Sequence, residues 1–198
     1  FHQPSLVLCD TNCLNTLSES EFANGAAEAI KTGILEGEEL FSLLESGGAR
    51  EQIDEIIARC VAFKARVVEQ DETETGLRKT LNLGHTAAHA IELCSGYTIP
   101  HGHAVAVGLA IIARAAEALG WTSANIAARV EAALVKNGLP ITTDFSPEAL
   151  ANAALSDKKR AGGKMTLVVP RGIGDCILMD IPVEQLERVF RAGMEAGA

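Results

Sequence analysis

One segment sets the architecture of this chain: the run from Ala104 to Gly120 is apolar on nearly every face of a helix. A helix at a protein surface carries a single apolar stripe, whereas one that is apolar all round is buried. The sequence therefore predicts a central helix against which the remaining segments pack.

Most of the other segments also have helical patterns. Ser18 followed by Glu21 has the spacing of a capping box and predicts a helix that runs to about Leu35. Residues 52–70 alternate apolar and charged side chains at helical spacing, which predicts a long amphipathic helix. Further helices are expected before Gly47-Gly48, around His85, over residues 123–137 before Gly138 and Pro140, from Ser146-Pro147 onward, and after Pro182.

Strand patterns are few. Residues 165–170 and 175–179 read as two strands around a glycine-containing turn, which predicts a β-hairpin. The apolar run from Ser5 to Asp10 predicts one buried strand with no neighbour nearby in the sequence, as if it belonged to a sheet encoded elsewhere. The expected fold class is mainly α, a multi-helical domain with a small terminal hairpin.

Composition narrows the functional classes. The chain has 198 residues, enough for one substantial core, and its net charge of −9 argues against non-specific nucleic-acid binding. The five cysteines have no disulfide or zinc-ribbon spacing, which favours reduced thiols in the cytoplasm. The longest apolar run, Ala104 to Ala113, is too short to cross a bilayer, and no signal peptide is recognised. A soluble protein without nucleic-acid or membrane partners is expected.

Four of the five histidines lie between positions 85 and 103. His85 and His89 are four residues apart and would share a helix face. A zinc peptidase would need glutamate directly after the first histidine, but Thr86 stands there, so that class is disfavoured. Both could be structural histidines. His101 follows a turn that can bring it back toward His85, and catalytic zinc commonly takes three protein ligands.

A carboxylate for such a site could come from Glu28, which pairs with Lys31 in a helix of small residues. Two charges there would be unfavourable without partners, although the sequence alone favours an exposed i, i+3 ion pair over a metal ligand. Other cations could form an anion site or simply be solvated: Lys64, Arg78 and the run Asp157-Lys158-Lys159-Arg160.

Several motifs occur in a fixed order along the chain: Gly25-x-x-Glu28-x-Ile30-Lys31-x-Gly33, Lys64, Asp71-Glu72-x-Glu74-x-Gly76-x-Arg78, Leu81-Asn82-x-Gly84-His85-Thr86, His89-Ala90-x-Glu92, His101-Gly102 and Asp157-Lys158-Lys159. In this order they resemble the C-terminal domain of the 3-dehydroquinate synthase family, over essentially the whole chain.

The resemblance implies a protein in two halves, with an N-terminal α/β domain that binds NAD and a helical C-terminal domain that carries Zn²⁺ or Co²⁺. Residues 1–16 would be a remnant of the NAD-binding domain, its last strand and linker. Residues 17–198 would be the helical metal- and substrate-binding domain. The full-length protein is expected to be a homodimer.

Carried over by motif, the resemblance implies Glu28, His85 and His101 as metal ligands. It implies substrate contacts from Lys31, Lys64, Arg78, Asn82, His89 and Lys158, the last with its register against Lys159 left open. No residue of this chain is expected to hold NAD. Ala87-Ala88 and Thr32 depart from the usual family pattern, and so does His103, which could compete as a ligand.

The implied reaction converts a phosphorylated sugar acid, 3-deoxy-arabino-heptulosonate 7-phosphate, into 3-dehydroquinate and phosphate in aromatic amino-acid biosynthesis. The chain alone is expected to be inactive because the NAD-binding half is missing. Two alternatives stay open: a related sugar-phosphate cyclase, and a metal-binding domain without activity.

Overall fold

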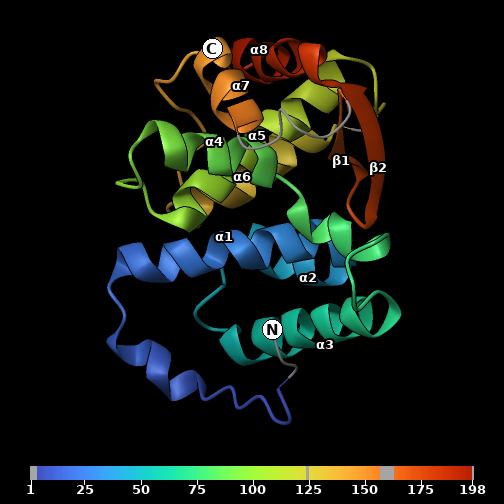
Figure 1. Ribbon diagram of the computed structural model, residues 1–198. Coiled ribbons are helices and arrows are strands. Elements are labelled where there is room, and N and C mark those ends of the chain that lie inside the picture. Colours follow the sequence, from blue (N-terminus) through green and yellow to red (C-terminus); the bar gives the residue numbers. More distant parts are fainter. Residues whose placement is uncertain (1–3, 124, 157–162, 198) are drawn as a thin grey trace.

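The computed structural model describes residues 4–123, 125–156 and 163–197. Within these ranges the fold is a set of α-helices with one two-stranded antiparallel sheet (Figure 1). The elements are η1 (Thr11–Thr16), α1 (Glu19–Glu36), α2 (Glu38–Glu45), α3 (Ile53–Gln70), η2 (Leu77–Asn82), α4 (His85–Cys94), α5 (His101–Ala118), α6 (Ile126–Lys136), α7 (Pro147–Ser156), β1 (Lys164–Gly172), β2 (Asp175–Pro182), η3 (Val183–Gln185) and α8 (Leu186–Glu195). The expected mainly α class is confirmed.

Helix α5 is the centre of the core, as its sequence predicts. Fourteen of its 18 residues are buried, and α1, α4, α6 and α8 all pack against it. The helix begins at His101 and not at Ala104, because Pro100 has an extended backbone and the helical conformation starts directly after it. His101 was expected just before this helix, and it is instead the helix's first residue.

The helix boundaries otherwise follow the local signals. The Ser18 hydroxyl accepts a hydrogen bond from the Glu21 backbone N–H at 3.2 Å, so the predicted N-cap of α1 is confirmed. Helix α2 ends at Glu45 before Gly47-Gly48, and α6 ends at Lys136 before Gly138. No helix in the described part of the chain is both long enough and apolar enough to cross a membrane.

The predicted hairpin is also present, and its strands are longer than expected. Gly172 pairs with Asp175, which leaves a two-residue turn in which Gly174 has a φ of +79°. The Gly174 N–H donates to the Ile34 carbonyl at 2.8 Å, so the tip of the hairpin is hydrogen-bonded to the C-terminal part of α1.

The predicted strand at Ser5–Asp10 is not formed. Residues 4–10 have no regular structure, and Leu6, Val7 and Leu8 are 72%, 63% and 84% exposed. A strand needs a hydrogen-bonded neighbour, and within the described residues the only sheet is the distant hairpin. The Asp10 side chain instead accepts from the Asn12 N–H and begins η1.

Candidate metal and substrate site

The start of α5 lies directly against α1, and this contact brings His101 close to Glu28. The Gly102 N–H donates to the Asn24 side-chain oxygen at 2.5 Å, which satisfies one of the unpaired donors of the α5 N-terminus. A Cβ at position 102 would overlap the Asn24 backbone carbonyl, so glycine permits the approach. Glu28 follows Asn24 by one helical turn and faces the same way.

The start of α4 is held against α5 by a second close contact. Gly84 precedes α4 with a φ of +76°, and a Cβ at Gly108 of α5 would overlap the Gly84 carbonyl. His85, the first residue of α4, therefore lies beside α5. Segments of three helices meet at this point: α1 and the two consecutive helices α4 and α5.

The three predicted metal ligands are brought together. Glu28 Oε1 lies 3.4 Å from His85 Nε2 and 3.4 Å from His101 Nε2. One ligand atom from each residue lies within 4.8 Å of the other two. Glu28 Oε1 is buried, yet neither contact has hydrogen-bond geometry, so this oxygen has no hydrogen-bond partner.

Both imidazoles use their other ring nitrogen elsewhere. His85 Nδ1 lies 3.0 Å from the Leu83 carbonyl, and His101 Nδ1 lies 3.0 Å from Glu92 Oε1. Because a carbonyl and a carboxylate only accept, each Nδ1 must carry the proton. In the neutral rings both Nε2 lone pairs then point toward the Glu28 oxygen.

The other oxygen of Glu28 is engaged by Lys31. Lys31 Nζ lies 2.6 Å from Glu28 Oε2, so the i, i+3 ion pair considered from the sequence is present. It is not a solvated pair, because the Lys31 side chain is only 8% exposed. Burial raises the pKa of the Glu28 carboxyl, but the Lys31 ammonium at 2.6 Å opposes this effect and favours the ionised form. Glu28 is thus a carboxylate at neutral pH.

This donor set fits a divalent metal ion. Two imidazole nitrogens and one carboxylate oxygen are a standard three-ligand set for catalytic zinc, which leaves a fourth position open. Three acceptors that face one another without a proton between them, one of them buried and unpaired, are stabilised by a cation. The ion-pair and metal interpretations of Glu28 are therefore compatible, since each uses a different oxygen.

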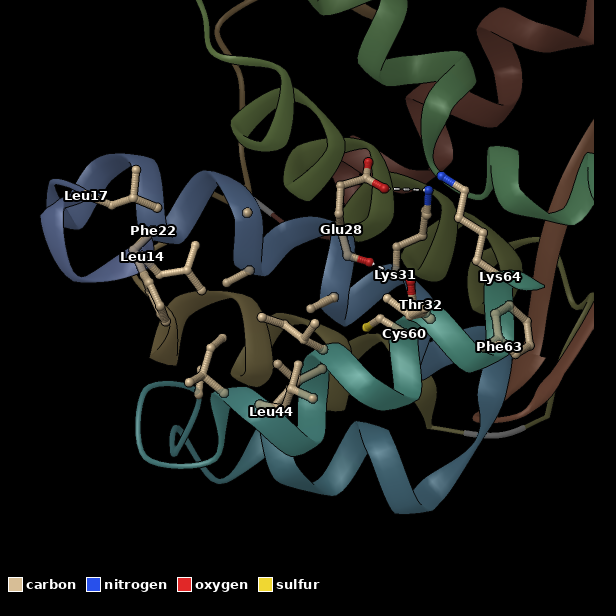
Figure 2. A pocket seen from close by; sticks show the side chains of 18 of the residues that line it. Leu14, Leu17, Phe22, Glu28, Lys31, Thr32, Leu44, Cys60, Phe63 and Lys64 are labelled. Carbon is tan, nitrogen blue, oxygen red and sulfur yellow. Dashed lines mark hydrogen bonds and ion pairs between the residues drawn. The ribbon is translucent and has the colours of Figure 1, made fainter. Parts of the chain in front are cut away.

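Lys31 and Lys64 line the same cavity, which has a volume of about 380 Å³ and lies between α1 and α3. In Figure 2 their ammonium ends point to the same side, near Glu28. Lys64 is exposed, and no hydrogen bond or ion pair involves it among the described residues. Most of the other residues that line the cavity are apolar, and α3 buries only Ile56 and Val67.

Arg78 and Asn82 belong to η2, directly before α4. The Asp71 carboxylate accepts from the backbone N–H groups of Thr75, Gly76 and Arg78 at 2.8–2.9 Å, which lowers the pKa of Asp71 to about 2. These bonds fold residues 71–78 into a compact loop. Arg78 Nη1 donates to the Glu72 carbonyl at 2.7 Å, and Asn82 Nδ2 donates to Glu74 Oε1 at 2.9 Å.

The remaining two described histidines, His89 and His103, lie in different places relative to the three candidate ligands. The His89 ring centroid lies 5.5 Å from that of His85 and 6.4 Å from that of His101, so His89 borders the ligand group. His103 lies outside that group and lines a different hollow with Arg50 and Lys136. The idea that His103 competes as a ligand finds no support in this geometry. Lys158 and Lys159 fall outside the described residues.

Three residues that organise the site were not assigned a role from the sequence. Asn24 caps α5, Asp71 folds the loop before Arg78, and Glu92 holds His101. Glu92 had a usable signal, because it follows His85 and His89 at i+7 and i+3 on one helix face. Asn24 had none, since its partner Gly102 is far away in the sequence.

Sequence comparison places these residues in a known family. Residues 25–160 match the model of the 3-dehydroquinate synthase C-terminal family. The chain is 43% identical over 194 residues to the 3-dehydroquinate synthase of Pelobacter propionicus, covering 94% of this chain and 54% of that protein. For the enzyme of Shewanella halifaxensis the identity is 42% over 202 residues, covering 96% and 56%. The chain thus spans about half the length of these curated relatives.

Solved structures of sugar-phosphate cyclases share the fold. The 2-epi-5-epi-valiolone synthase ValA of Streptomyces hygroscopicus, with NAD⁺ and Zn²⁺ bound, superposes with a TM-score of 0.79 at 25% identity, over 93% of this chain and 54% of that one. A 2-deoxy-scyllo-inosose synthase in complex with carbaglucose-6-phosphate, NAD⁺ and Co²⁺ gives 0.78 at 22% identity, over 93% and 55%. By its sequence match and its fold, this chain belongs to the 3-dehydroquinate synthase C-terminal family.

Proposed function

We propose that this chain is the metal- and substrate-binding half of a 3-dehydroquinate synthase, which converts 3-deoxy-arabino-heptulosonate 7-phosphate into 3-dehydroquinate and phosphate. The observation that carries the proposal is the buried, unpaired Glu28 Oε1, which faces the Nε2 atoms of His85 and His101. Residues 1–16 would then belong to the NAD-binding half, and residues 17–198 would form the helical domain.

Glu28, His85 and His101 would hold Zn²⁺ or Co²⁺. An ion bound there would act as a Lewis acid that polarises an oxygen of the substrate. The chain's own contribution is to present three ligands from closely packed helices. Lys31 keeps Glu28 Oε2 occupied, so the carboxylate offers one oxygen to the ion and not both. Because Glu28 is already ionised at neutral pH, no proton has to leave it before the ion binds.

The cations beside this site suit an anionic substrate. Lys31 and Lys64 border one cavity, and Arg78 is held by its loop directly before α4. Ammonium and guanidinium groups bind carboxylate and phosphate through charge-assisted hydrogen bonds, which would fix the substrate's orientation. Asn82 and His89 would add neutral hydrogen bonds. We include Lys158 in this set on sequence grounds alone.

The described residues do not fit NAD. Dinucleotides bind to parallel βαβ units through a glycine-rich turn at a helix N-terminus. The sheet of the described residues is a two-stranded antiparallel hairpin, and no such unit is present within them. We therefore assign NAD to no residue of this chain and expect the chain alone to release no phosphate from the sugar phosphate.

Sequence identity favours dehydroquinate synthase over other cyclases. The curated dehydroquinate synthases are 43% and 42% identical to the chain, whereas the two solved cyclases named above are 25% and 22% identical. The fold itself does not discriminate. An assay of a full-length protein that contains this chain, with NAD⁺ and Zn²⁺, would compare phosphate release from 3-deoxy-arabino-heptulosonate 7-phosphate and from a hexose 6-phosphate. Turnover of the hexose phosphate alone would overturn the assignment.

The metal site can be tested on this chain directly by titration with Zn²⁺. His85→Ala is expected to weaken Zn²⁺ binding more than about 100-fold, because even partners outside the ligand set contribute 10- to 100-fold. His103→Ala is the matched control, since it removes an imidazole that lies outside the ligand group. Equal Zn²⁺ affinity for wild type and His85→Ala would overturn the ligand assignment. A purely metal-binding domain would pass this test and fail the activity assay.

We also propose a cytoplasmic location and, for the full-length protein, a homodimer. The cysteines Cys9, Cys13, Cys60, Cys94 and Cys176 are all free thiols, which suits a reducing compartment. Sedimentation of the full-length protein would test the dimer.

A further inference from the structure

Glu92 is a half-buried carboxylate that the proposed function leaves without a role. It lies on α4, one turn beyond His89 and two turns beyond His85, so these three side chains share one helix face. Its side chain is only 16% exposed. An ionised carboxylate in such a place needs a partner.

The partner of Glu92 is His101, the first residue of the next helix. Glu92 Oε1 lies 3.0 Å from His101 Nδ1, on the side of the ring opposite to Glu28. A carboxylate that accepts the Nδ1 proton fixes the tautomer and the plane of the ring, and it makes Nε2 a stronger electron donor. The Nε2 atom is the one that faces Glu28 Oε1 at 3.4 Å.

His101 depends on this contact more than His85 does. The His85 side chain is 12% exposed, whereas that of His101 is 45% exposed and has less packing to hold its ring. His85 Nδ1 is hydrogen-bonded to the backbone carbonyl of Leu83, a partner fixed by the main chain. The orientation of His101 rests on the side chain of Glu92.

We propose that Glu92 is a positioning residue of the metal centre: it holds His101 with the proton on Nδ1, so that Nε2 is directed at the ion. The inference rests on the proposed metal site and adds a residue outside the ligand set. Glu92 does not bind the ion. Its effect on metal affinity is exerted through the His101 ring.

Two substitutions separate orientation from charge. Glu92→Ala removes the acceptor, and Zn²⁺ affinity is expected to fall about 10- to 100-fold in competition with a chromophoric chelator. Glu92→Gln keeps an acceptor oxygen without the charge, so a smaller loss is expected. The matched controls are Glu117→Ala and Glu117→Gln. Glu117 accepts from the Ala127 N–H near the far end of α5, about 24 Å along the helix axis from His101.

A second measurement reports on the His101 ring without metal. Long-range ¹H–¹⁵N spectra of metal-free protein labelled at histidine nitrogens distinguish the two tautomers. Wild type is expected to hold His101 in the Nδ1–H form, and Glu92→Ala is expected to give a mixture. A merely structural role for Glu92 would change the thermal midpoint and leave the tautomer of His101 as it is in wild type.

The outcomes distinguish this inference from the proposed function. If wild type binds no Zn²⁺, the metal site itself is wrong. If wild type binds Zn²⁺ and folded Glu92→Ala binds it within twofold of wild type, the positioning role is refuted and the metal site stands. An Nδ1–H tautomer that persists in Glu92→Ala would refute the positioning role independently of metal affinity.

Discussion

The two sides of α1 are packed very differently. On the side of α5, backbone touches backbone: the Asn24 carbonyl leaves no room for a Cβ at Gly102. On the side of α3 there is a cavity of about 380 Å³, and α3 buries only Ile56 and Val67 (Figure 2). Protein interiors are normally close-packed, so the open side is the unusual one.

The difference parallels the proposed division of labour in the site. Ligands for an ion must be held within a few tenths of an ångström. His85 and His101 come from the tightly packed side, and Glu28 lies on α1 between that side and the cavity. Lys64 comes from α3 across the cavity, where a helix with few buried side chains can adjust to a ligand. Rigidity is thus found where the proposed metal ion would bind, and freedom where the proposed substrate would enter.

The sharpest test of this contrast is truncation of one isoleucine on each side. Ile30 of α1 is fully buried and does not line the cavity, and Ile30→Ala is expected to lower the free energy of unfolding by about 4 kcal/mol. Ile57 of α3 borders the existing cavity, so Ile57→Ala should lower it by about 1 kcal/mol or less. Urea unfolding of both variants gives the comparison. Equal losses would mean that α1 is packed as tightly against α3 as on its other side.

Addition of one methyl group probes the same contrast. Gly102→Ala forces a Cβ into the Asn24 backbone, and it is expected to destabilise the fold by about 3 kcal/mol and to weaken Zn²⁺ binding. Gly25→Ala is the control, because Gly25 of α1 borders the cavity and a Cβ there would meet no atom within 4 Å. It should stabilise the chain by about 0.5–1 kcal/mol, because alanine favours a helix interior. A destabilised Gly25→Ala variant would contradict the open packing of this side.

The Asp71 loop gives a pH-dependent test. The folded pKa of Asp71, about 2, lies below its ordinary value of 3.8. A lowered pKa adds stability that is fully present above the unfolded pKa and is lost as pH falls through the folded pKa. The free energy of unfolding should therefore decline between about pH 4 and pH 2, and Asp71→Asn should flatten part of that decline. Denaturant unfolding from pH 2 to pH 6 measures it. An unchanged slope in the variant would show that these backbone hydrogen bonds do not hold Asp71 ionised.

Lys64 should show the smallest effect on stability. It is exposed, and it has no ion pair in the described residues, so Lys64→Met is expected to change the free energy of unfolding by less than about 0.5 kcal/mol. Zn²⁺ affinity should stay at the wild-type value, while binding of the sugar phosphate to the full-length protein weakens. A loss of Zn²⁺ binding would place Lys64 in the metal site instead.

Much of this fold could be predicted because its signals are local. The all-round apolar pattern of residues 104–120 identified the central helix, and Ser18 with Glu21 marked the start of α1. The hairpin followed from two apolar runs around a glycine turn. The prediction of a strand at residues 5–10 was wrong. A strand needs a hydrogen-bonded neighbouring strand, and an apolar run in the sequence does not reveal whether one is present.

The geometry of the candidate site could be predicted from the sequence only in part. Spacing alone related His85 to His89, whereas the structure groups His85 with Glu28 and His101 through helix contacts that spacing does not encode. Glycines 84, 102 and 108 make those contacts, and their importance lies in what a Cβ would strike. The sequence also could not show that the two oxygens of Glu28 have different partners. Oε2 contacts Lys31 of the same helix, whereas Oε1 faces histidines from two other helices.

If Glu28, His85 and His101 hold an ion as proposed, the meeting of three helices at one point also links metal binding to folding. An ion that binds only the assembled ligands adds RT ln(1 + [ion]/Kd) to the free energy of unfolding, about 2.7 kcal/mol at 100 times Kd. Glu28 reaches the other two ligands only while α1 lies against α5 through Asn24 and Gly102. The thermal midpoint of this chain should therefore rise with the free concentration of the ion around it.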